Sequence, residues 1–248
     1  MPTDDYVDRV RERLLSGDLL DVAFDDLLPP GARAKSGLHW SPLSVARRAA
    51  LRFATRGARR VLDVGCGPGK FCIAAAFARP ELEFCGVDRR VGLVGTATDL
   101  ARRLTLRNVT FSAGDALELP WPDFDGFYFF NPFDQNALTS HHTFNETVDV
   151  SQVRLGSELL RVAQLLSSAR TGTVIVTYHG LGGPIPSSYD LVSEEPCGSG
   201  CLRTWVKTRA HELSFYHVDR ADDVSRVPRS YLERKLGAAE LSLSVSTS

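Results

Sequence analysis

The sequence has no apolar run long enough to cross a membrane, and it has few cysteines. A membrane-spanning helix needs about 20 consecutive, mostly apolar residues, and no run in the 248 residues approaches that length. The five cysteines are an odd number, which argues against a disulfide framework and favours a reducing compartment. The acidic amino terminus lacks the basic-then-apolar layout of a signal peptide. We therefore expect a cytoplasmic protein without a membrane partner.

The sequence also lacks a large net charge, which is −1. A basic field over the whole surface, which would favour nucleic acid as a partner, is thus not expected. The charge is nevertheless uneven, because residues 1–28 carry eight acids against three arginines and residues 31–60 carry eight basic residues and no acid. Two interpretations remain: a solvated face whose two halves pair with each other, or a basic rim that attracts an anionic substrate.

Length and composition predict one globular domain with additional segments. The apolar fraction of 43% and the charged fraction of 24% are ordinary for a globular protein, and the length allows an ample core. We predict an N-terminal helical segment over residues 1–56, a main domain over residues 57–218, and a polar, partly flexible tail over residues 219–248.

The spacing of apolar residues predicts helices that alternate with strands. The expected helices cover residues 6–15, 19–28, 42–55, 71–78, 91–104 and 150–166, with Ser41 as the cap of the third. The expected strands cover residues 61–64, 83–87, 109–112, 124–130, 173–178, 202–207 and 212–218. This alternation predicts an α/β fold with a doubly wound, mostly parallel seven-stranded sheet. The last two strands are expected to form a closing antiparallel hairpin.

The segment between Val61 and Lys70 joins a buried strand to an apolar helix through an acid and three glycines. Glycines allow a ligand to approach the backbone closely, and the helix that follows directs free N–H groups at it. A dinucleotide fingerprint requires a glycine at position 70, where Lys70 stands, and a P-loop requires a hydroxyl residue at position 71, where Phe71 stands. The remaining pattern is Asp-x-Gly-x-Gly-x-Gly, formed by Asp63, Gly65, Cys66, Gly67 and Gly69.

This pattern resembles motif I of the class I methyltransferases that use S-adenosylmethionine (SAM). The resemblance implies the fold described above, with Asp63 and the glycine loop holding the methionine part of SAM. It also draws attention to Asp88 and Arg89, at the end of the second strand. An acid at this place binds ribose hydroxyls through its carboxylate oxygens. The alternative is that Asp88 only caps the next helix.

Two further segments extend the resemblance on the cofactor side. The sequence Gly114-Asp115-Ala116 follows the third strand and looks like the adenine-recognition motif of the family, although an aspartate in a turn is the alternative. Trp40-Ser41-Pro42 is similar to an aromatic-Thr-Pro segment that lies across SAM in some nitrogen-directed methyltransferases. Trp40 would then pack on the sulfonium or the adenine, a contact of about 1–2 kcal/mol when desolvated; otherwise it is a core anchor.

The segment Asn131-Pro132-Phe133 follows the fourth strand and resembles the Asn-Pro-Pro-Phe/Tyr motif of methyltransferases that act on planar nitrogens. The resemblance implies that Asn131 and the Pro132 carbonyl accept hydrogen bonds from the acceptor amine and that Phe133 stacks on it, with Asn131 also bordering SAM. Only one proline is present, so transfer to oxygen, carbon or sulfur stays open. Candidate bases for those reactions are His141, His142 and His179.

Cys197 and Cys201 have a spacing that zinc ligands can adopt, but no second ligand pair accompanies them. We therefore expect no metal site. The sequence favours a SAM-dependent methyltransferase with a small-molecule acceptor, nitrogen being one candidate atom. The alternatives are a protein or nucleic-acid acceptor, a SAM-binding subunit without catalysis, and a nicotinamide-dependent reductase, which Lys70 disfavours.

Overall fold

A computed structural model describes residues 2–130, 132, 152–210 and 215–218. Its strands are β1 (Arg60–Val64), β2 (Glu83–Asp88), β3 (Val109–Ala113), β4 (Gly126–Phe129), β5 (Val174–Tyr178), β6 (Pro184–Pro186), β7 (Tyr189–Cys197), β8 (Gly200–Lys207) and β9 (Phe215–Val218). Its α-helices are α1 (Asp4–Ser16), α2 (Asp21–Asp25), α3 (Pro30–Arg33), α4 (Ser36–His39), α5 (Leu43–Thr55), α6 (Lys70–Ala78), α7 (Val91–Arg103) and α8 (Gln152–Ser168). Two short 3-10 helices, η1 (Ala116–Glu118) and η2 (Trp121–Asp123), precede β4.

The main sheet has seven strands in the order β3-β2-β1-β4-β5-β8-β7. Strands β1 to β5 run parallel, whereas β8 pairs antiparallel with β5 and β7 pairs antiparallel with β8. The predicted fold class is therefore confirmed. From β1 the sheet extends to β2 and β3 on one side and to β4 and β5 on the other. The topological switch point therefore lies between β1 and β4, and ligands of such sheets bind there, outside the carboxyl ends of the strands.

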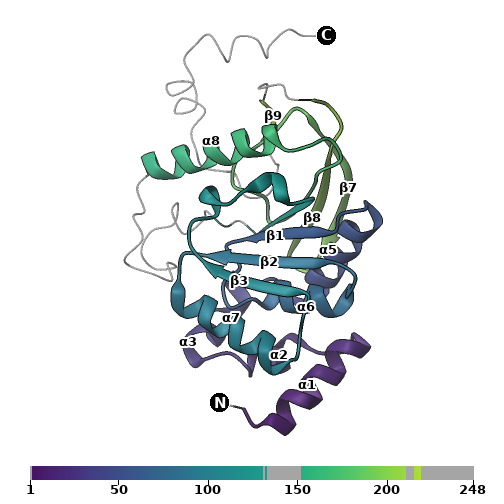
Figure 1. Ribbon diagram of the computed structural model, residues 1–248, viewed down its shortest axis with the longest axis vertical. Helices are drawn as coiled ribbons and strands as arrows, with labels where there is room; N and C mark the ends of the chain where they lie inside the picture. The colour runs from purple at the N-terminus through teal and green to yellow at the C-terminus, as the bar shows by residue number, and fades with distance from the viewer. Residues whose placement is uncertain (1, 131, 133–151, 211–214, 219–248) are drawn as a thin grey trace.

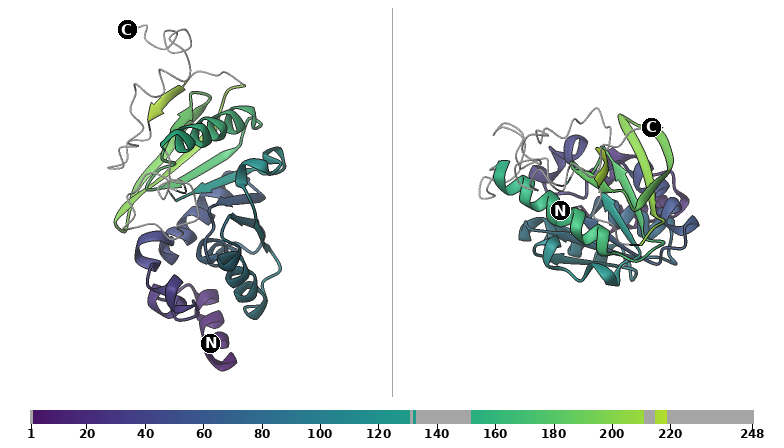
Figure 2. Two further views of the ribbon diagram at one scale, coloured as in Figure 1. Left: turned by 90° about the vertical axis from the view of Figure 1, so that its left-hand side faces the viewer. Right: turned by 90° about the horizontal axis from the view of Figure 1, so that it is seen from above.

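Helices cover both faces of the sheet, and two buried clusters fill the space between the layers. Because side chains alternate across a strand, Val61 in β1 belongs to the cluster beneath α5, α6 and α7. The next residue, Leu62, belongs to the cluster beneath α8. Figure 1 and Figure 2 show α8 on one side of the sheet and the other three helices opposite.

The N-terminal helices pack on the outside of α6 and share its core. Val10, Phe24 and Trp40 lie in the same buried cluster as Phe53 of α5 and Phe71 of α6. Figure 1 shows α1 and α2 below the helical layer, at the far end of the molecule from α8. The core of the sheet is thus continuous with the core of the N-terminal segment.

The predicted hairpin of residues 202–207 with residues 212–218 is wrong. Strand β8 turns back on β7 through the two residues Gly198 and Ser199, while β9 pairs with β6 in a separate two-stranded sheet. Strand β7 is an edge strand with mostly exposed or half-buried side chains, and it carries two glutamates and Pro196. Such residues are tolerated because one side of an edge strand needs no partner. Because they are polar or break a strand pattern, a search for apolar residues does not predict this strand.

The start of α5 also differs from the prediction. Ser41 does not cap the helix, which begins at Leu43 without a side-chain cap from its neighbours. Instead, the Leu43 N–H donates to Asp21 Oδ1 of α2 at 2.9 Å. The Ser41 hydroxyl pairs with the Tyr128 hydroxyl of β4 at 2.7 Å. A cap from another helix satisfies the free N–H as well as a local cap does. The Ser41 side chain is therefore available to connect the start of α5 to β4 of the sheet.

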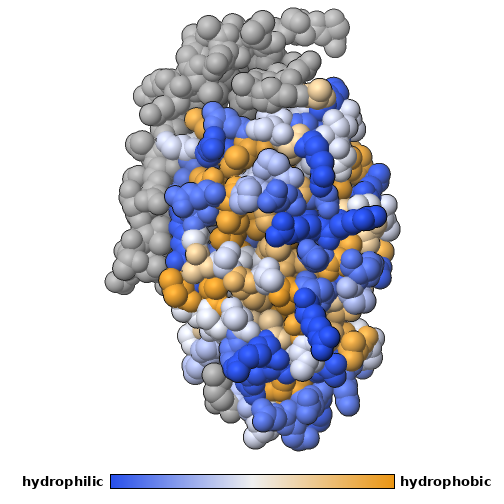
Figure 3. Space-filling view, in the orientation of Figure 1, coloured by the Kyte–Doolittle hydropathy of each residue, from blue (hydrophilic) through white to orange (hydrophobic). Residues whose placement is uncertain are grey.

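The surface mixes charged and apolar residues. On the face of Figure 3, hydrophilic and hydrophobic residues are interspersed. Arg33 pairs with Asp26 of the acidic segment, whereas Arg48 and Arg52 pair with Glu195 of β7. Among the described residues, no helix is both long and apolar enough to cross a membrane.

Candidate active site

The glycine loop joins β1 to α6 at the centre of the sheet. The N–H groups of Gly65 and Cys66 both donate to the Val87 carbonyl of β2, at 2.9 and 3.0 Å, which fixes the loop against the neighbouring strand. Gly67 adopts a left-handed φ of 54°, and a Cβ built there would lie 2.5 Å from the Trp40 ring. Glycine is therefore required at position 67 for both its conformation and its lack of a side chain.

Trp40 covers the loop and is fixed in place. Its side chain is 6% exposed, its indole N–H donates to the Ala32 carbonyl at 2.9 Å, and its ring lies against Gly67. Trp40 is thus a buried anchor beside the glycine loop, and its contact with a cofactor stays a prediction.

Asp63 is buried in β1, beside the loop. Its carboxylate accepts from the Cys72 thiol at 3.4 Å. Burial is the main cause that raises the pKa of Asp63 to about 7; the bond from the Cys72 thiol opposes the rise and the charge of Asp88 adds to it. An acid in such a site gains from a cationic partner, because a nearby positive charge favours the ionised form.

The two cysteines of this region are not reactive groups. Burial raises the pKa of the Cys66 and Cys72 thiols well above their ordinary value, and Asp63 adds to the effect. Because the thiolate is the nucleophile and the metal ligand, both side chains are held in the unreactive thiol form, in which Cys72 donates to Asp63. Among the described residues, no cluster of three or more His, Cys, Asp or Glu side chains can hold a metal ion.

Asp88 ends β2 and is surrounded by donors. Its carboxylate accepts from the Gly67 N–H at 2.9 Å and from the Arg90 N–H at 2.9 Å. The Arg90 guanidinium adds two more bonds, from Nε at 2.8 Å and from Nη2 at 2.6 Å. Asp88 therefore bonds to the glycine loop and to the residue before α7, whereas no side chain caps the first turn of that helix, so the capping interpretation of Asp88 is wrong.

Asp115 follows β3 and is held by two elements. Its carboxylate accepts from the Leu117 N–H at 2.9 Å, which caps η1, and from Arg89 Nη2 at 2.7 Å. The Arg89 guanidinium also reaches Glu158 of α8 at 2.8 Å. The N–H of the adjacent Gly114 donates to the Asp88 carbonyl at 3.1 Å, so a hydrogen bond joins the ends of β2 and β3. Ala116 is the first residue of η1.

Sequence reasoning missed Glu158 and the role of Lys70. Glu158 is a buried acid four residues before Val162, on the apolar face of α8, and an acid on such a face is a signal that could have identified it. Lys70 is buried at the start of α6 and pairs with Asp21 and Asp25 of α2. No local pattern indicates that contact, because its partners lie far away in the sequence.

The loops after β4 and β5 approach the glycine loop from the other side. A Cβ at Gly65 would lie 3.1 Å from Pro132 Cβ. Phe130, two residues earlier, packs on Tyr178 at 5.1 Å and stacks on His179 at 5.5 Å between ring centroids. Asn131, Phe133, His141 and His142 lie outside the described residues.

His179 has an unusual backbone and a close neighbour at the start of β8. Its φ is 56°, a left-handed conformation that costs energy in a non-glycine residue and is enriched at functional sites. Its imidazole is so near to Gly200 that a Cβ there would lie 2.6 Å from Nε2. The hairpin therefore forms a wall beside His179. Of the two cysteines in this hairpin, Cys197 is buried and Cys201 is partly buried.

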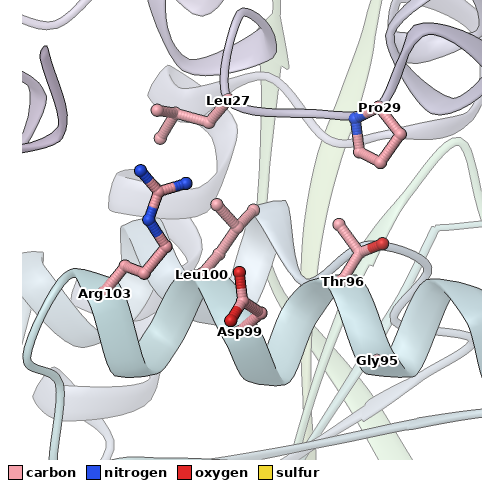
Figure 4. Close-up of a pocket in the computed structure, with 7 residues that line it drawn as sticks. All are labelled: Leu27, Pro29, Gly95, Thr96, Asp99, Leu100 and Arg103. Atoms are coloured by element: carbon pink, nitrogen blue, oxygen red, sulfur yellow. The ribbon is translucent and has the colours of Figure 1, made fainter. Parts of the chain in front are cut away.

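A separate groove lies between α7 and the N-terminal segment. Leu27 and Pro29 form one side, and α7 residues between Gly95 and Arg103 form the other; Figure 4 shows Thr96, Leu100 and Arg103 directed toward them. None of the lining residues is among the predicted site residues, so this groove is distinct from the glycine loop.

Comparison with known proteins identifies the domain. Residues 56–189, more than half of the chain, match the family described as "Methyltransferase domain". The chain belongs to the class I SAM-dependent methyltransferases. The chain is 31% identical over 173 residues to ajmaline N-methyltransferase of Rauvolfia serpentina, covering 67% of the chain and 54% of the relative. It is 30% identical over 167 residues to protein-L-isoaspartate O-methyltransferase of Shewanella amazonensis, covering 65% and 74%.

Solved structures show the same fold. An RNA methyltransferase of Salinibacter ruber, in complex with S-adenosyl-L-homocysteine (SAH), superimposes with a TM-score of 0.50 at 16% identity, over 71% of this chain and 99% of the other. This likeness shows the fold, and the family match over residues 56–189 confirms the predictions of the family and its SAM cofactor. The chain spans about half the length of the ajmaline enzyme, and the relatives differ in the acceptors that their names give.

Asp63 is the residue of the site that fits SAM directly. Its carboxylate is buried, and the ammonium of SAM would favour its ionised form. The space that a Cβ would take at Gly67 is filled by the Trp40 ring. Asp88 and Asp115 place carboxylates at the next two strand ends, where Arg90 and Arg89 pair with them.

Proposed function

We propose that this methyltransferase transfers a methyl group from SAM to a small-molecule acceptor, with nitrogen as the favoured atom. The observation that carries the proposal is the contact of Pro132 with Gly65, which brings the loop after β4 to the glycine loop. The similarity to ajmaline N-methyltransferase supports a small acceptor, and the Asn131-Pro132-Phe133 sequence supports nitrogen.

The proposed roles of the cofactor-side residues follow from their positions. Asp63 and the loop residues Gly65, Cys66, Gly67 and Gly69 bind the methionine part. Asp88, with Arg89 beside it, binds the ribose. Residues Gly114, Asp115 and Ala116 bind the adenine, and Trp40 covers the ligand from the side of the N-terminal segment. Each role needs only hydrogen bonds and packing that these groups can make.

The acceptor-side residues orient the reacting nitrogen. Bound SAM supplies a methyl group that its sulfonium already activates. The Asn131 side chain and the Pro132 carbonyl accept hydrogen bonds from the acceptor amine, which directs the nitrogen lone pair, and Phe133 stacks on the acceptor. Alignment of this kind can supply much of the rate acceleration. His179, beside Phe130, is the candidate base for an acceptor that must lose a proton.

Two measurements test this function. Thermal shift with SAM, SAH and NAD should show stabilisation by the first two only, because a ligand that binds the folded state raises the melting temperature. SAH release should then be measured with heterocyclic amines, phenols, a protein substrate and tRNA. Turnover of tRNA or protein alone would contradict a small acceptor, and SAM binding without turnover of any acceptor would favour a non-catalytic subunit.

Asn131→Ala separates the acceptor role from cofactor binding. The variant should lower kcat by about ten-fold or more, because the acceptor nitrogen loses its alignment, while the Kd for SAH changes little. Thr105→Ala, at an exposed residue after α7, provides a control that should change neither quantity. Equal losses in kcat and SAH affinity would make Asn131 a cofactor ligand instead.

A further inference from the structure

Two consecutive arginines hold the acids at the ends of β2 and β3. Arg89 bonds to Asp115 and Glu158, and Arg90 bonds to Asp88. The second pair is deeply buried, with side-chain exposures of 9% for Arg90 and 3% for Asp88. The site that is expected to bind ribose and adenine therefore contains its own cations.

The carboxylate of Asp88 has no acceptor capacity left. A carboxylate offers about four lone-pair sites, and four donors already occupy them: the N–H groups of Gly67 and Arg90 and two groups of the Arg90 guanidinium. Ribose hydroxyls can bond to Asp88 only where a donor leaves. The two backbone donors are fixed by the glycine loop and by the start of α7, so the guanidinium is the group that can move.

The surroundings of Arg90 fit a displaceable group. Its guanidinium carbon lies 5.7 Å from the centre of the Trp40 ring, so it stands between the ribose-binding acid and the fixed indole. Arg90 is also the residue that precedes the first turn of α7, and that turn contains no acid. A cation at a helix N-terminus is unfavourably placed relative to the helix dipole, and the ion pair with Asp88 offsets that cost.

We propose that Arg90 competes with the cofactor for Asp88 and thereby sets the affinity for SAM. The inference rests on the proposed function, since it assigns the ribose to Asp88. SAM binding then requires the guanidinium to leave the carboxylate, and the free energy of the Arg90–Asp88 pair is subtracted from the free energy of binding. Trp40 and Asp88 remain in place, and the arginine side chain is the moving part.

The test is calorimetric binding of SAH and SAM to the full chain and to Arg90→Gln. Without the guanidinium, the Kd for SAH should fall by about five-fold or more, the lower range of ordinary coupling between two ligands. The Kd for SAM should fall further, because removing a positive charge favours the cationic ligand more than the neutral thioether. Arg102→Gln, at an exposed arginine of the same helix, should leave both values unchanged.

A second variant covers the case in which Arg90→Gln does not fold, because an unpaired buried carboxylate is costly. Arg90→Lys keeps the charge but loses the two-pronged geometry, and it should tighten SAH binding less but in the same direction. Unchanged or weaker binding by the folded variants would overturn the inference. If the wild-type chain binds neither SAM nor SAH, the proposed function itself fails.

Discussion

The ammonium of Lys70 lies 2.7 Å from the carboxylate of Asp25, a residue 45 positions earlier in the chain. The Ser36 hydroxyl accepts from the same ammonium at 3.1 Å, and Asp21 forms an ion pair with it at 2.7 Å. The ammonium is thus well compensated although the Lys70 side chain is only 3% exposed. Lys70 therefore connects the helix of the glycine loop to the N-terminal segment.

Replacing Lys70 should destabilise the protein. Lys70→Met should lower the free energy of unfolding by about 2 kcal/mol, because the Asp25 carboxylate, which is 16% exposed, loses a charged hydrogen-bond donor. Urea denaturation measures the difference. Arg9→Met removes the exposed Arg9–Asp5 pair of α1 and should cost less than about 1 kcal/mol. Equal stability of Lys70→Met and the wild type would show that the buried pair contributes nothing.

Asp63 should make the stability of the ligand-free protein depend on pH. Its pKa in the folded state is about 7, above the ordinary 3.8, so the folded state binds more protons than the unfolded state between those values. The contribution of Asp63 to stability is complete below about pH 4 and is lost as the pH rises to about 7. The difference between the two pKa values corresponds to at most about 4 kcal/mol in the free energy of unfolding.

The measurement is the free energy of unfolding between pH 4 and 8, for the wild type and for Asp63→Asn. The amide does not titrate, so the variant should lose this part of the slope and should be the more stable protein relative to the wild type above pH 7. Glu81→Gln, at an exposed acid before β2, serves as the control. A slope that is the same in all three proteins would refute the role given to Asp63.

Asp88→Ala should weaken cofactor binding. The substitution removes the acceptor proposed for the ribose and also leaves the Gly67 N–H without its partner, so the Kd for SAH should rise by at least about ten-fold. Asp99→Ala, on α7 and paired with exposed Arg102, should leave the Kd unchanged. An unchanged Kd for Asp88→Ala would show that another group binds the ribose.

Gly200→Ala tests the contact between the start of β8 and His179. A Cβ at this position would lie 2.6 Å from the imidazole, so the ring must move. We expect kcat to fall by about ten-fold or more, since small displacements at a reacting centre are costly, with little change in the Kd for SAH. Gly95→Ala meets no atom within 4 Å and provides the matched control. A loss confined to SAH affinity would place His179 on the cofactor side.

Local patterns predicted the central strands and the acids that end them. The glycine loop, Asp88 and Asp115 each belong to a short segment whose residues determine both its conformation and its place at the edge of a parallel sheet. These features follow from neighbours in the sequence. The parallel part of the sheet followed for the same reason, because each of its central strands is itself apolar.

Features that depend on partners far away in the sequence could not be predicted from local patterns. The cap of α5 comes from Asp21, and no pattern around Leu43 identifies it. Strand β7 is stabilised by pairing with β8, not by its own composition. The bond from Arg90 to Asp88 is local, but its effect depends on Trp40 and Gly67, which folding brings alongside. In each case the feature is stabilised mainly by a tertiary contact.

The buried hydroxyl pair of Ser41 and Tyr128 also bears on how the molecule comes apart. Tyr128 stacks on Phe71 at 3.6 Å between ring centroids, so a strand, a helix and the entry to α5 meet at one phenol. If the N-terminal segment detached, the Tyr128 hydroxyl would stay buried in an apolar layer without the Ser41 hydroxyl as its partner. Residues before α5 and the central sheet should therefore melt in one cooperative transition, with no intermediate in which the segment alone has peeled away.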